Sequence, residues 1–331
     1  MSDFKAYLIE EDGDGKSRGR MTTMTRDALD AGEVVLKVQY SSVNYKDALA
    51  ATGQGKIIRR FPCVGGIDMA GTVESSSNDA FKPGDAVIAT SYDIGVAHHG
   101  GYAEVARLPA GWVLPLPRGL SLEETMALGT AGLTAGLAVA RMEQCGLKPG
   151  QGPVAVTGAT GGVGGLAIDM LAGRGYEVHA FTRKASEKDY LQTLGAAEVR
   201  LVDELDLEKI RPLQSGQWAG AVDNVGGPML AWLLATMQQG GTVASIGNAA
   251  SHRLETTVFP FILRGVSLLG IDSVQADHAL RSTVWQRLGS DLKPGHLAAM
   301  TEVIDLDALP SSFDDFIAGR IRGRRVVRIG G

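Results

Sequence analysis

The chain has 331 residues, of which 44% are hydrophobic and 21% are charged, and its formal net charge is −5. This length favours two domains that each bury a core, and the composition is typical of a globular protein. The small negative charge argues against a nucleic acid or an anionic membrane surface as partner, because both require a broad basic face. No apolar run reaches the length of a membrane span and the residues from Met1 to Lys5 do not begin a secretory signal, so we expect a cytoplasmic protein.

The cysteines and histidines do not form a metal-binding pattern. Cys63 and Cys145 are the only cysteines and make no CxxC pair. They therefore support neither a disulfide framework nor a cysteine-built zinc site, and we expect both to be small buried side chains. His98 and His99 are adjacent but have no matching cysteine or acid, which is more typical of a loop pair than of metal ligands. We therefore predict no bound metal.

The first third of the chain is predicted to be rich in β-structure. Alternating or apolar runs at 4–10, 33–40 and 86–89 indicate strands, and turns such as 81–85 (FKPGD) separate them. Short strands punctuated by such turns suggest a small barrel-like domain. A last strand-like run at 325–329 has no partner nearby in the sequence, so we expect it to return to this first domain.

The pattern changes at Ser121, which forms a capping box with Glu124 and begins a helix. Strand-like and helical runs then alternate, with strands expected at 154–156, 176–181, 198–202, 220–223, 242–247 and 266–271. This alternation predicts an α/β fold with a doubly wound parallel sheet and right-handed crossovers.

A glycine-rich turn, TGATGGVG, follows the first of these strands. Gly158 permits a tight turn, Gly161 and Gly162 remove side chains where a pyrophosphate approaches the backbone, and Gly164 lets the next helix lie close to the strand. The amino terminus of that helix would face the phosphates. Because a second strand follows the helix at the required spacing, the segment is predicted to be a dinucleotide-binding βαβ unit.

The end of the second strand indicates which cofactor is bound. An NAD site offers an acid to the ribose hydroxyls, whereas an NADP site offers cations and hydroxyls to the 2′-phosphate. This chain has Thr182, Arg183 and Lys184 there, with no acid before Glu187. Charge-assisted hydrogen bonds from Arg183 and Lys184 would favour NADPH. The alternative is that the two cations are an ordinary solvated loop pair.

Four segments carry a family resemblance: 41–49 (SSVNYKDAL), 66–73 (GIDMAGTV), 129–135 (GTAGLTA) and 256–273 (TTVFPFILRGVSLLGIDS). Together they resemble the zinc-independent branch of the medium-chain dehydrogenase/reductase superfamily, close to the quinone oxidoreductases, and within it the acryloyl-CoA reductase subgroup. The resemblance covers nearly the whole chain. The last segment is the most discriminating, because it is long and general requirements of the fold do not explain it.

The resemblance implies a domain organisation. A GroES-like β-rich catalytic domain, residues 1–122 and 273–331, would be interrupted by a Rossmann NADPH-binding domain, residues 123–272, with the active site in the cleft between them. It also implies a homodimer joined through the strand at 266–271, since an apolar strand at a free sheet edge would otherwise promote aggregation. The alternative is that this strand is internal and covered by its own chain.

The resemblance also implies which residues contact NADPH. Carried over residue by residue, they are Tyr45, Thr160, Gly161, Gly162, Val163, Thr182, Arg183, Lys184, Asn248, Ile262 and Ser273. The subgroup often has Ser-Gly-Arg where this chain has Thr182-Arg183-Lys184, so the identity of the cation that holds the phosphate stays open.

The same resemblance suggests a reaction. Where zinc alcohol dehydrogenases of this superfamily keep a cysteine and a histidine, this chain has Asn44 and Ile67, and isoleucine cannot ligate a metal. Reduction of an activated C=C bond remains, in which NADPH delivers hydride to the β-carbon of a CoA thioester and charge moves to the thioester oxygen. Tyr45 is the candidate catalytic residue; the alternative is that it only packs against or hydrogen-bonds the nicotinamide ribose. We expect Asn44 and Asp47 to hold the backbone of their loop and Asp68 to accept hydrogen bonds from it.

Three functions compete. The leading one is an NADPH-dependent acryloyl-CoA reductase that makes propanoyl-CoA. An NADPH:quinone oxidoreductase would share the fold and cofactor but need an open apolar slot, and a non-catalytic NADPH-binding protein is the third. A CoA substrate would need a cationic rim for its phosphates, and surface charge explains the candidate cations equally well: Lys56, Arg59, Arg60, Arg320, Arg322, Arg324 and Arg325.

Overall fold

The computed structural model describes residues 3–330. Contacts group the chain into two compact units. The first comprises Met1–Thr130, Val274–Gln286 and Leu297–Gly331, and the second comprises Ala131–Ser273 and Arg287–His296. The predicted limits of the functional domains, after residues 122 and 272, stay predictions.

The first unit is rich in β-structure, as the turn pattern indicates. Its strands are β1 (Phe4–Glu11), β2 (Ser17–Met24), β3 (Val34–Val43), β4 (Cys63–Val64), β5 (Asp68–Ser76), β6 (Ala86–Thr90), β7 (Val105–Leu108), β8 (Val113–Pro115), β15 (Thr301–Asp305) and β16 (Arg324–Arg328). Its helices are α1 (Tyr45–Thr52), α8 (Leu309–Ile317) and most of α7 (His278–Leu288), with the 3-10 helices η1 (Arg26–Ala28), η2 (Ala110–Trp112), η5 (Ala298–Met300) and η6 (Leu306–Ala308).

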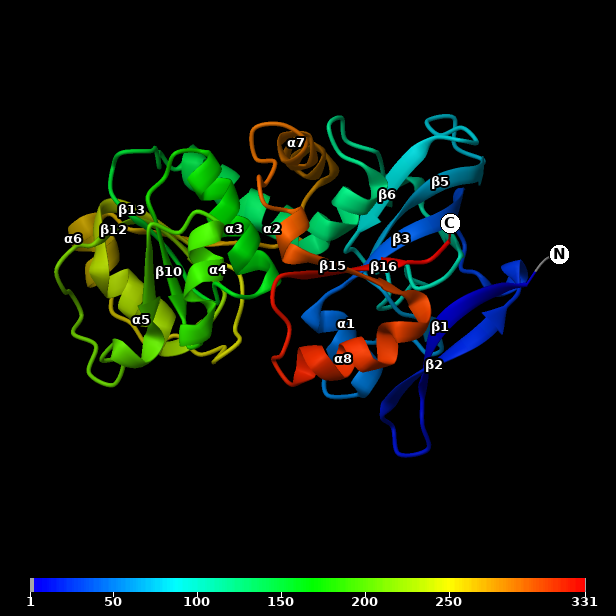
Figure 1. Cartoon of the computed structure of the whole chain (residues 1–331), viewed down its shortest axis with the longest axis horizontal. Coiled ribbons are helices and arrows are strands. Elements are labelled where there is room, and N and C mark those ends of the chain that lie inside the picture. The colour runs from blue at the N-terminus through cyan, green and yellow to red at the C-terminus, as the bar shows by residue number, and fades with distance from the viewer. Residues whose placement is uncertain (1–2, 331) are drawn as a thin grey trace. The chain divides into compact units, whose positions relative to one another are not determined.

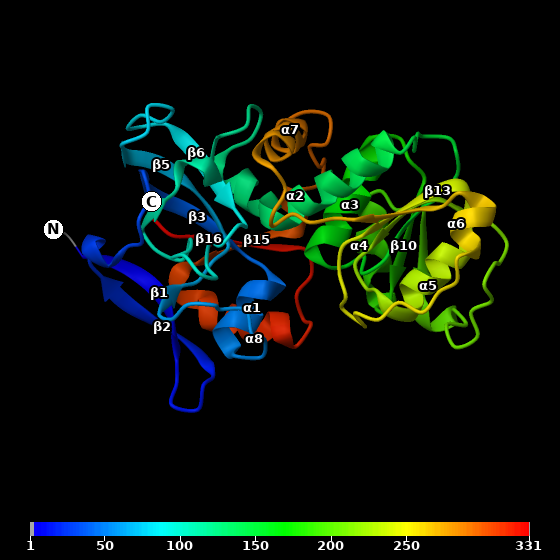
Figure 2. The same cartoon turned by 180° about the vertical axis from the view of Figure 1, so that it is seen from behind.

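The strands of this unit form two sheets. One runs β2-β1-β4, and the other runs β15-β16-β3-β5-β6-β8, with β7 also paired to β3. The C-terminal strand β16 pairs antiparallel with β3, so the chain does return to its first domain, as predicted (Figure 1). Helices α1 and α8 pack side by side (Figure 2). Val43, Tyr102, Phe313 and Val327 contribute to the apolar core of this region.

The second unit alternates strands and helices. Its strands are β9 (Val154–Val156), β10 (Val178–Thr182), β11 (Glu198–Leu201), β12 (Trp218–Asp223), β13 (Met237–Ser245) and β14 (Ser267–Gly270). Its helices are α3 (Gly162–Gly173), α4 (Lys188–Thr193), α5 (Gly227–Thr236) and α6 (Phe259–Arg264), with the 3-10 helices η3 (Ala185–Glu187) and η4 (Val202–Glu204).

Helix α2 (Leu122–Gln144) supplies residues to both units. The predicted capping box is present, because Ser121 N donates to Glu124 Oε2 and Glu124 N donates to Ser121 Oγ. The helix is interrupted at Gly129, where φ is 52° and ψ is −153°. Such a left-handed residue is easily adopted only by glycine. The interruption falls at the site described below.

The six strands of the second unit are parallel and lie in the order β11-β10-β9-β12-β13-β14. This is the order of a Rossmann sheet, with the switch point between β9 and β12. The predicted α/β fold class is therefore confirmed. Because parallel strands share one direction, the turn after β9 and the segments after β10, β12, β13 and β14 all lie at the carboxyl edge of the sheet, where ligands bind.

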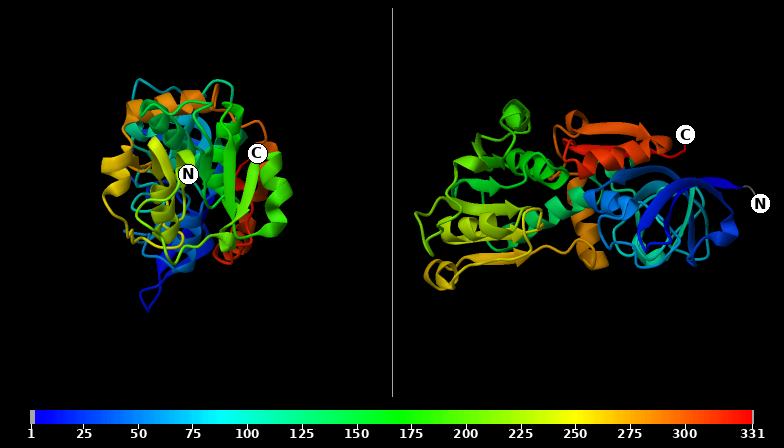
Figure 3. Two further views of the ribbon diagram at one scale, coloured as in Figure 1. Left: turned by 90° about the vertical axis from the view of Figure 1, so that its left-hand side faces the viewer. Right: turned by 90° about the horizontal axis from the view of Figure 1, so that it is seen from below.

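Strand β14 lies at the border of the described sheet, with β13 on its one paired side. In Figure 3, right, β14 and α6 form the yellow border of this unit. The prediction of an edge strand at 266–271 agrees with this position.

One prediction about side chains is wrong. Cys63 is buried as expected, but Cys145 is exposed. It follows the last residue of α2, Gln144, and precedes a left-handed Gly146, so it lies in a surface turn rather than on a packed face. In residues 3–330, no helix is long and apolar enough to cross a membrane.

Candidate cofactor and active site

The turn after β9 has the geometry that a bound pyrophosphate needs. Gly158 has a φ of 59°, and the amino terminus of α3 begins after Gly161 with no side chain capping it. A Cβ on Gly164 would lie 2.4 Å from the carbonyl oxygen of Gly158, so glycine is required there for the helix to lie against the turn. The backbone amides at the start of α3 are therefore uncovered and able to bind an anion.

The switch point is fixed by side chains as well. Thr157 Oγ1 donates to Asp223 Oδ1 at 2.7 Å, and Asn224 Nδ2 donates to the carbonyl oxygen of Thr157 at 2.8 Å. Burial raises the pKa of Asp223, while the donors from Thr157 and the backbone oppose that rise. These bonds tie the end of β12 to the end of β9. The sequence analysis did not identify them, although polar residues directly after two buried strands were a usable signal.

A cavity of about 420 Å³ lies at this edge of the sheet. It brings together four of the predicted cofactor residues, Thr160, Thr182, Arg183 and Lys184. Lys184 N donates to Thr182 Oγ1 at 3.0 Å, which fixes the turn after β10. Side chains that the sequence analysis missed complete the wall, and they are mainly apolar: Val202, Leu207, Val225, Pro228 and Met229. Such a cavity fits an aromatic base beside a phosphate-bearing ribose.

The remaining predicted cofactor residues of this unit separate into two groups. Asn248 follows β13 and Ser273 follows β14, so both lie at the carboxyl edge with the glycine turn. Thr134 Oγ1 donates to Ser273 Oγ at 2.8 Å. Ile262 instead lies on α6, which precedes β14, and the neighbouring Arg264 bonds the carbonyl oxygens of Ala235 and Met237 at the start of β13. Ile262 is therefore at the opposite edge from the other predicted residues.

In the first unit, Tyr45 is the first residue of α1 and is 56% exposed. Asn44 precedes it as N-cap, and Asn44 N donates to Asp47 Oδ2 at 2.9 Å while Ile67 N donates to Asp47 Oδ1 at 3.0 Å. The prediction that Asn44 and Asp47 hold the loop's backbone is confirmed. This box fixes the direction in which α1 begins and so the position of Tyr45.

Asp68, at the start of β5, is the centre of a buried polar cluster. Its carboxylate accepts from Ser42 Oγ at 2.6 Å, Asn44 Nδ2 at 2.8 Å, Thr130 N at 3.0 Å and Thr130 Oγ1 at 2.5 Å. The predicted role of Asp68 as acceptor for the Tyr45 loop is confirmed. A Cβ on Gly129 would lie 2.6 Å from Asp68 Oδ2, which explains the glycine at the interruption of α2.

Arg324 of β16 enters the same cluster, and the sequence analysis assigned it only to a possible surface rim. It is 2% exposed, and it donates to the carbonyl oxygens of Ala127 and Val43 and to Asn44 Oδ1. Burial lowers the pKa of Arg324, while Asp68 and Asp47 raise it. Burial also raises the pKa of Asp47 to about 7, and the charge of Asp68 adds to that rise.

Sequence and structure comparisons identify the family. Residues 30–118 match the alcohol dehydrogenase GroES-like domain, and residues 162–289 match the zinc-binding dehydrogenase model. A Bacillus subtilis protein named putative quinone oxidoreductase YhfP is 48% identical, with 98% of this chain and 99% of that protein covered. The acrylyl-CoA reductase AcuI of Ruegeria pomeroyi is 46% identical over the same shares of both chains. The chain belongs to the medium-chain dehydrogenase/reductase family.

Solved structures agree with this assignment. The yhdH oxidoreductase of Salmonella enterica, crystallised with NADP, is 44% identical with a TM-score of 0.95, and the match covers 98% of this chain and 100% of that one. The Bacillus subtilis protein yhfP, crystallised with NAD bound, is 46% identical with a TM-score of 0.97, and the match covers 99% of this chain and 100% of that one. The fold of this medium-chain reductase is thus matched along its whole length.

The family that residues 162–289 match is described as zinc-binding, so a zinc site would be expected among the polar side chains. Within residues 3–330, no group of three His, Cys, Asp or Glu side chains is arranged to hold a metal ion. Val64 N donates to His99 Nδ1, and His99 Nε2 donates to the carbonyl oxygen of Ala28, so both ring nitrogens are used. Burial lowers the pKa of His99, as expected for a neutral ring. The donor set therefore does not fit a zinc ion.

Four of the cations considered for a CoA-binding rim have carboxylate partners in this medium-chain reductase. Arg59 pairs with Asp93, and Arg60 pairs with Asp30. Arg320 and Arg325 both pair with Asp315. Since these guanidinium groups already have carboxylate partners, they are weaker candidates for phosphate than the sequence suggested.

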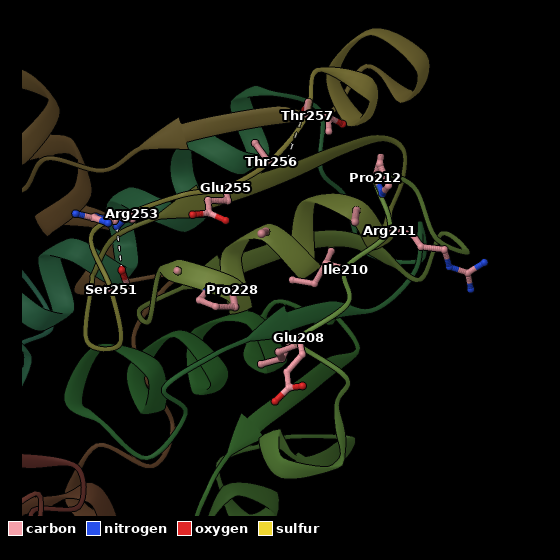
Figure 4. Close-up of a pocket in the computed structure, with 14 residues that line it drawn as sticks. Glu208, Ile210, Arg211, Pro212, Pro228, Ser251, Arg253, Glu255, Thr256 and Thr257 are labelled. Atoms are coloured by element: carbon pink, nitrogen blue, oxygen red, sulfur yellow. Dashed lines mark hydrogen bonds between the residues drawn. The ribbon is translucent and has the colours of Figure 1, made fainter.

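A second cavity, of about 530 Å³, lies over α5. Figure 4 shows that its two arginines, Arg211 and Arg253, point in opposite directions. Because the cations do not converge, the cavity lacks the arrangement of a phosphate site.

The pKa of Asp47 predicts a pH effect on stability. Its folded-state pKa of about 7 exceeds its ordinary value of 3.8, so the folded protein holds the proton more tightly. The stability that this proton gives is present below pH 4 and is lost as the pH rises to about 7. We expect the melting temperature of Asp47→Asn, measured by scanning calorimetry, to depend less negatively on pH between about 5 and 7 than that of the wild type. Parallel curves for the two proteins would contradict this.

Proposed function

We propose that this protein is an NADPH-dependent reductase that converts acryloyl-CoA to propanoyl-CoA. The observation that carries the proposal is the match, along 98% of the chain, to an enzyme named acrylyl-CoA reductase at 46% identity. The second protein of that name, the probable acrylyl-CoA reductase AcuI of Escherichia coli, is 43% identical. Location in the cytoplasm remains part of the proposal.

The cofactor cavity supports NADPH. The uncovered amides at the start of α3 would hold the pyrophosphate, and Asn248 and Ser273 lie at the same sheet edge for the nicotinamide end. Arg183 and Lys184 would bind the 2′-phosphate, and the turn offers no acid to the ribose at the end of β10. When bound, NADPH supplies the hydride that adds to the β-carbon of the thioester.

The first unit supplies the polar groups of the proposed active site, and the proposed reaction requires no metal. Tyr45 is held at the start of α1 by the Asn44–Asp47 box, and no described residue bonds its hydroxyl. That hydroxyl can donate to the reacting thioester or to the nicotinamide ribose. Asn44 cannot donate to substrate, because its amide hydrogens are directed at Asp47 and Asp68. Asn44 and Ile67 also lack the ligand atoms of a zinc site.

Reduction of a quinone is the second candidate. The 48% identical Bacillus subtilis relative is named a putative quinone oxidoreductase, and the neutralised arginines described above weaken the case for a CoA phosphate site. The structure of that relative was solved with NAD bound, so NADH is the comparison cofactor in the test.

Initial rates separate these candidates. Oxidation of NADPH and of NADH at 340 nm would be followed with acryloyl-CoA and, in parallel, with a simple benzoquinone. We expect the highest kcat/KM for acryloyl-CoA with NADPH. Turnover of the quinone alone would rule out the proposed substrate, and absence of turnover with every acceptor would favour the non-catalytic function.

The phosphate contacts can be tested by removing each cation. Charge-assisted hydrogen bonds contribute about 1.5–3 kcal/mol, so we expect Arg183→Ala or Lys184→Ala to weaken NADPH binding roughly 10- to 100-fold. NADH binding should stay unchanged, and so should both affinities in Lys188→Ala, an exposed lysine on the following helix. Titration by cofactor fluorescence gives the dissociation constants. Equal losses for NADPH and NADH would show that the two cations do not read the 2′-phosphate.

We also propose a homodimer formed through β14. Its second edge has no partner strand among the described residues, and α6 beside it exposes Val258 (60%), Phe259 (43%), Ile262 (68%) and Leu263 (56%). Exposed apolar side chains next to an open edge are typical of an interface. In an antiparallel pair of β14 strands, α6 of the second copy would lie beside Ser273. Such a dimer would bring Ile262 of the second copy to the carboxyl edge of the first copy's sheet. The predicted contact between Ile262 and NADPH would then be made across the dimer.

A charge on the exposed face of α6 tests the dimer. Ile262→Glu should leave the protomer folded, because the side chain is 68% exposed, and should shift the mass measured by light scattering from dimer to monomer. Lys148→Glu, at an exposed position of the same unit, is the control and should stay dimeric. A monomeric wild type, or a dimeric Ile262→Glu, would contradict the proposed interface.

A further inference from the structure

Two residues after β6 have an unusual backbone. Ser91 (φ 63°) and Tyr92 (φ 49°) are the non-glycine residues with positive φ in the part of the chain that the structure describes. Such a conformation costs free energy in any residue with a Cβ and persists only where surrounding contacts hold it, most often at functional sites. Contacts of the Tyr92 side chain must therefore hold this strained backbone in place.

The ring of Tyr92 is held by two neighbours. It stacks on Trp112 with centroids 5.5 Å apart and planes inclined by 9°, and the guanidinium of Arg281 lies 4.2 Å from its centroid. Arg281 is itself buried and fixed, because it donates to the carbonyl oxygens of Thr90 and Val274. The guanidinium is therefore held against the face of the ring in a cation–π contact.

Tyr92 and Tyr45 belong to the same end of one sheet. The strands β3, β5 and β6 are antiparallel neighbours, so the end of β3, the start of β5 and the end of β6 coincide. Tyr45 follows the first of these ends and Tyr92 follows the last, with Asp68 between them at the start of β5. Hydrogen bonds connect the three segments, because Ser91 Oγ bonds Thr130 Oγ1 at 2.8 Å and Thr130 Oγ1 donates to Asp68.

The hydroxyl and amide groups around Asp68 have already used their hydrogens. The hydroxyls of Ser42 and Thr130 donate to Asp68, and that of Ser91 then donates to Thr130. The amide of Asn44 is directed at Asp47 and Asp68. No described residue bonds the hydroxyl of Tyr92, and that oxygen is not among the buried atoms without a partner, so it is open to solvent. Arg324 Nη2 also has no hydrogen-bond partner, but it is buried. Tyr45 and Tyr92 therefore carry the solvent-facing donors of this cluster.

We propose that Tyr92 is a catalytic residue whose hydroxyl donates a hydrogen bond to the thioester oxygen of the substrate. This inference rests on the proposed function. As the β-carbon is reduced, the C=C electron pair shifts to the bond between the α-carbon and the carbonyl carbon, and the carbonyl pair moves onto oxygen. Tyr92 stabilises that oxygen without losing its proton. The carbonyl re-forms when the α-carbon takes a proton from water.

Tyr92→Phe is a close test, because phenylalanine keeps the ring against Trp112 and Arg281 and removes only the hydroxyl. Loss of one donor to a developing oxyanion lowers kcat by about 10²-fold or more, so we expect such a fall with little change in KM for acryloyl-CoA. Hydride transfer should become more rate-limiting, so the isotope effect with NADPH deuterated at C4 should rise. Tyr40→Phe, at a half-buried tyrosine of β3, is the matched control, and Tyr45→Phe is measured alongside.

The outcomes are separable. If the wild type does not reduce acryloyl-CoA, the proposed function fails, and the role of Tyr92 fails with it. If the wild type is active and Tyr92→Phe keeps its kcat, the inference about Tyr92 alone is overturned. The inference is also overturned if Tyr92→Phe lowers the melting temperature together with the activity. The same holds if Tyr40→Phe lowers kcat as much as Tyr92→Phe does. A fall in kcat with unchanged melting temperature and NADPH affinity supports it.

Discussion

The carboxylate of Asp68 holds together the segments that form the candidate catalytic end of the first unit. It accepts hydrogen bonds from the end of β3, from the N-cap of α1 and from the residue after the interruption of α2. Ser42 and Asn44 are close in the sequence, but Asp68 and Thr130 lie far from them and from each other, so no local preference could bring these groups together. A buried carboxylate must be fully hydrogen-bonded, and that requirement dictates the position of each donor.

This requirement explains residues that otherwise look unrelated. Gly129 is needed because a side chain there would collide with Asp68 and Arg324. Asn44 serves as a double donor that caps α1, so it cannot also act on a ligand. The proposed chemistry therefore falls to the hydroxyls of Tyr45 and Tyr92, at the ends of the strands that this cluster connects. The cluster therefore positions reactive groups rather than reacting itself.

Much of the fold could be predicted from the sequence, because the information was local. The capping box at Ser121, the glycine turn and the alternation of strands and helices each follow from short-range rules, and the strand order agrees with them. The candidate site was predicted less completely. The role of Arg324 depends on a strand that returns from the end of the chain, and the ring contacts of Tyr92 depend on Trp112 and Arg281. Contacts between residues so far apart in the chain leave no periodic pattern in the sequence. The exposure of Cys145 was not predicted, because cysteine is usually buried but this one lies in a surface turn after α2.

The charges of the buried cluster explain why one of its acids is easily protonated. Asp68 and Asp47 share one buried cation, Arg324. Asp68 accepts four hydrogen bonds, and Asp47 is buried beside it. Ionising Asp47 would place a poorly solvated negative charge in a medium of low dielectric constant, next to the charge of Asp68, which is unfavourable. The pKa of Asp47 therefore rises to about 7, although Asn44 and Ile67 donate to its carboxylate. Burial of Asp47 first, and the neighbouring charge of Asp68 second, therefore set where that proton resides.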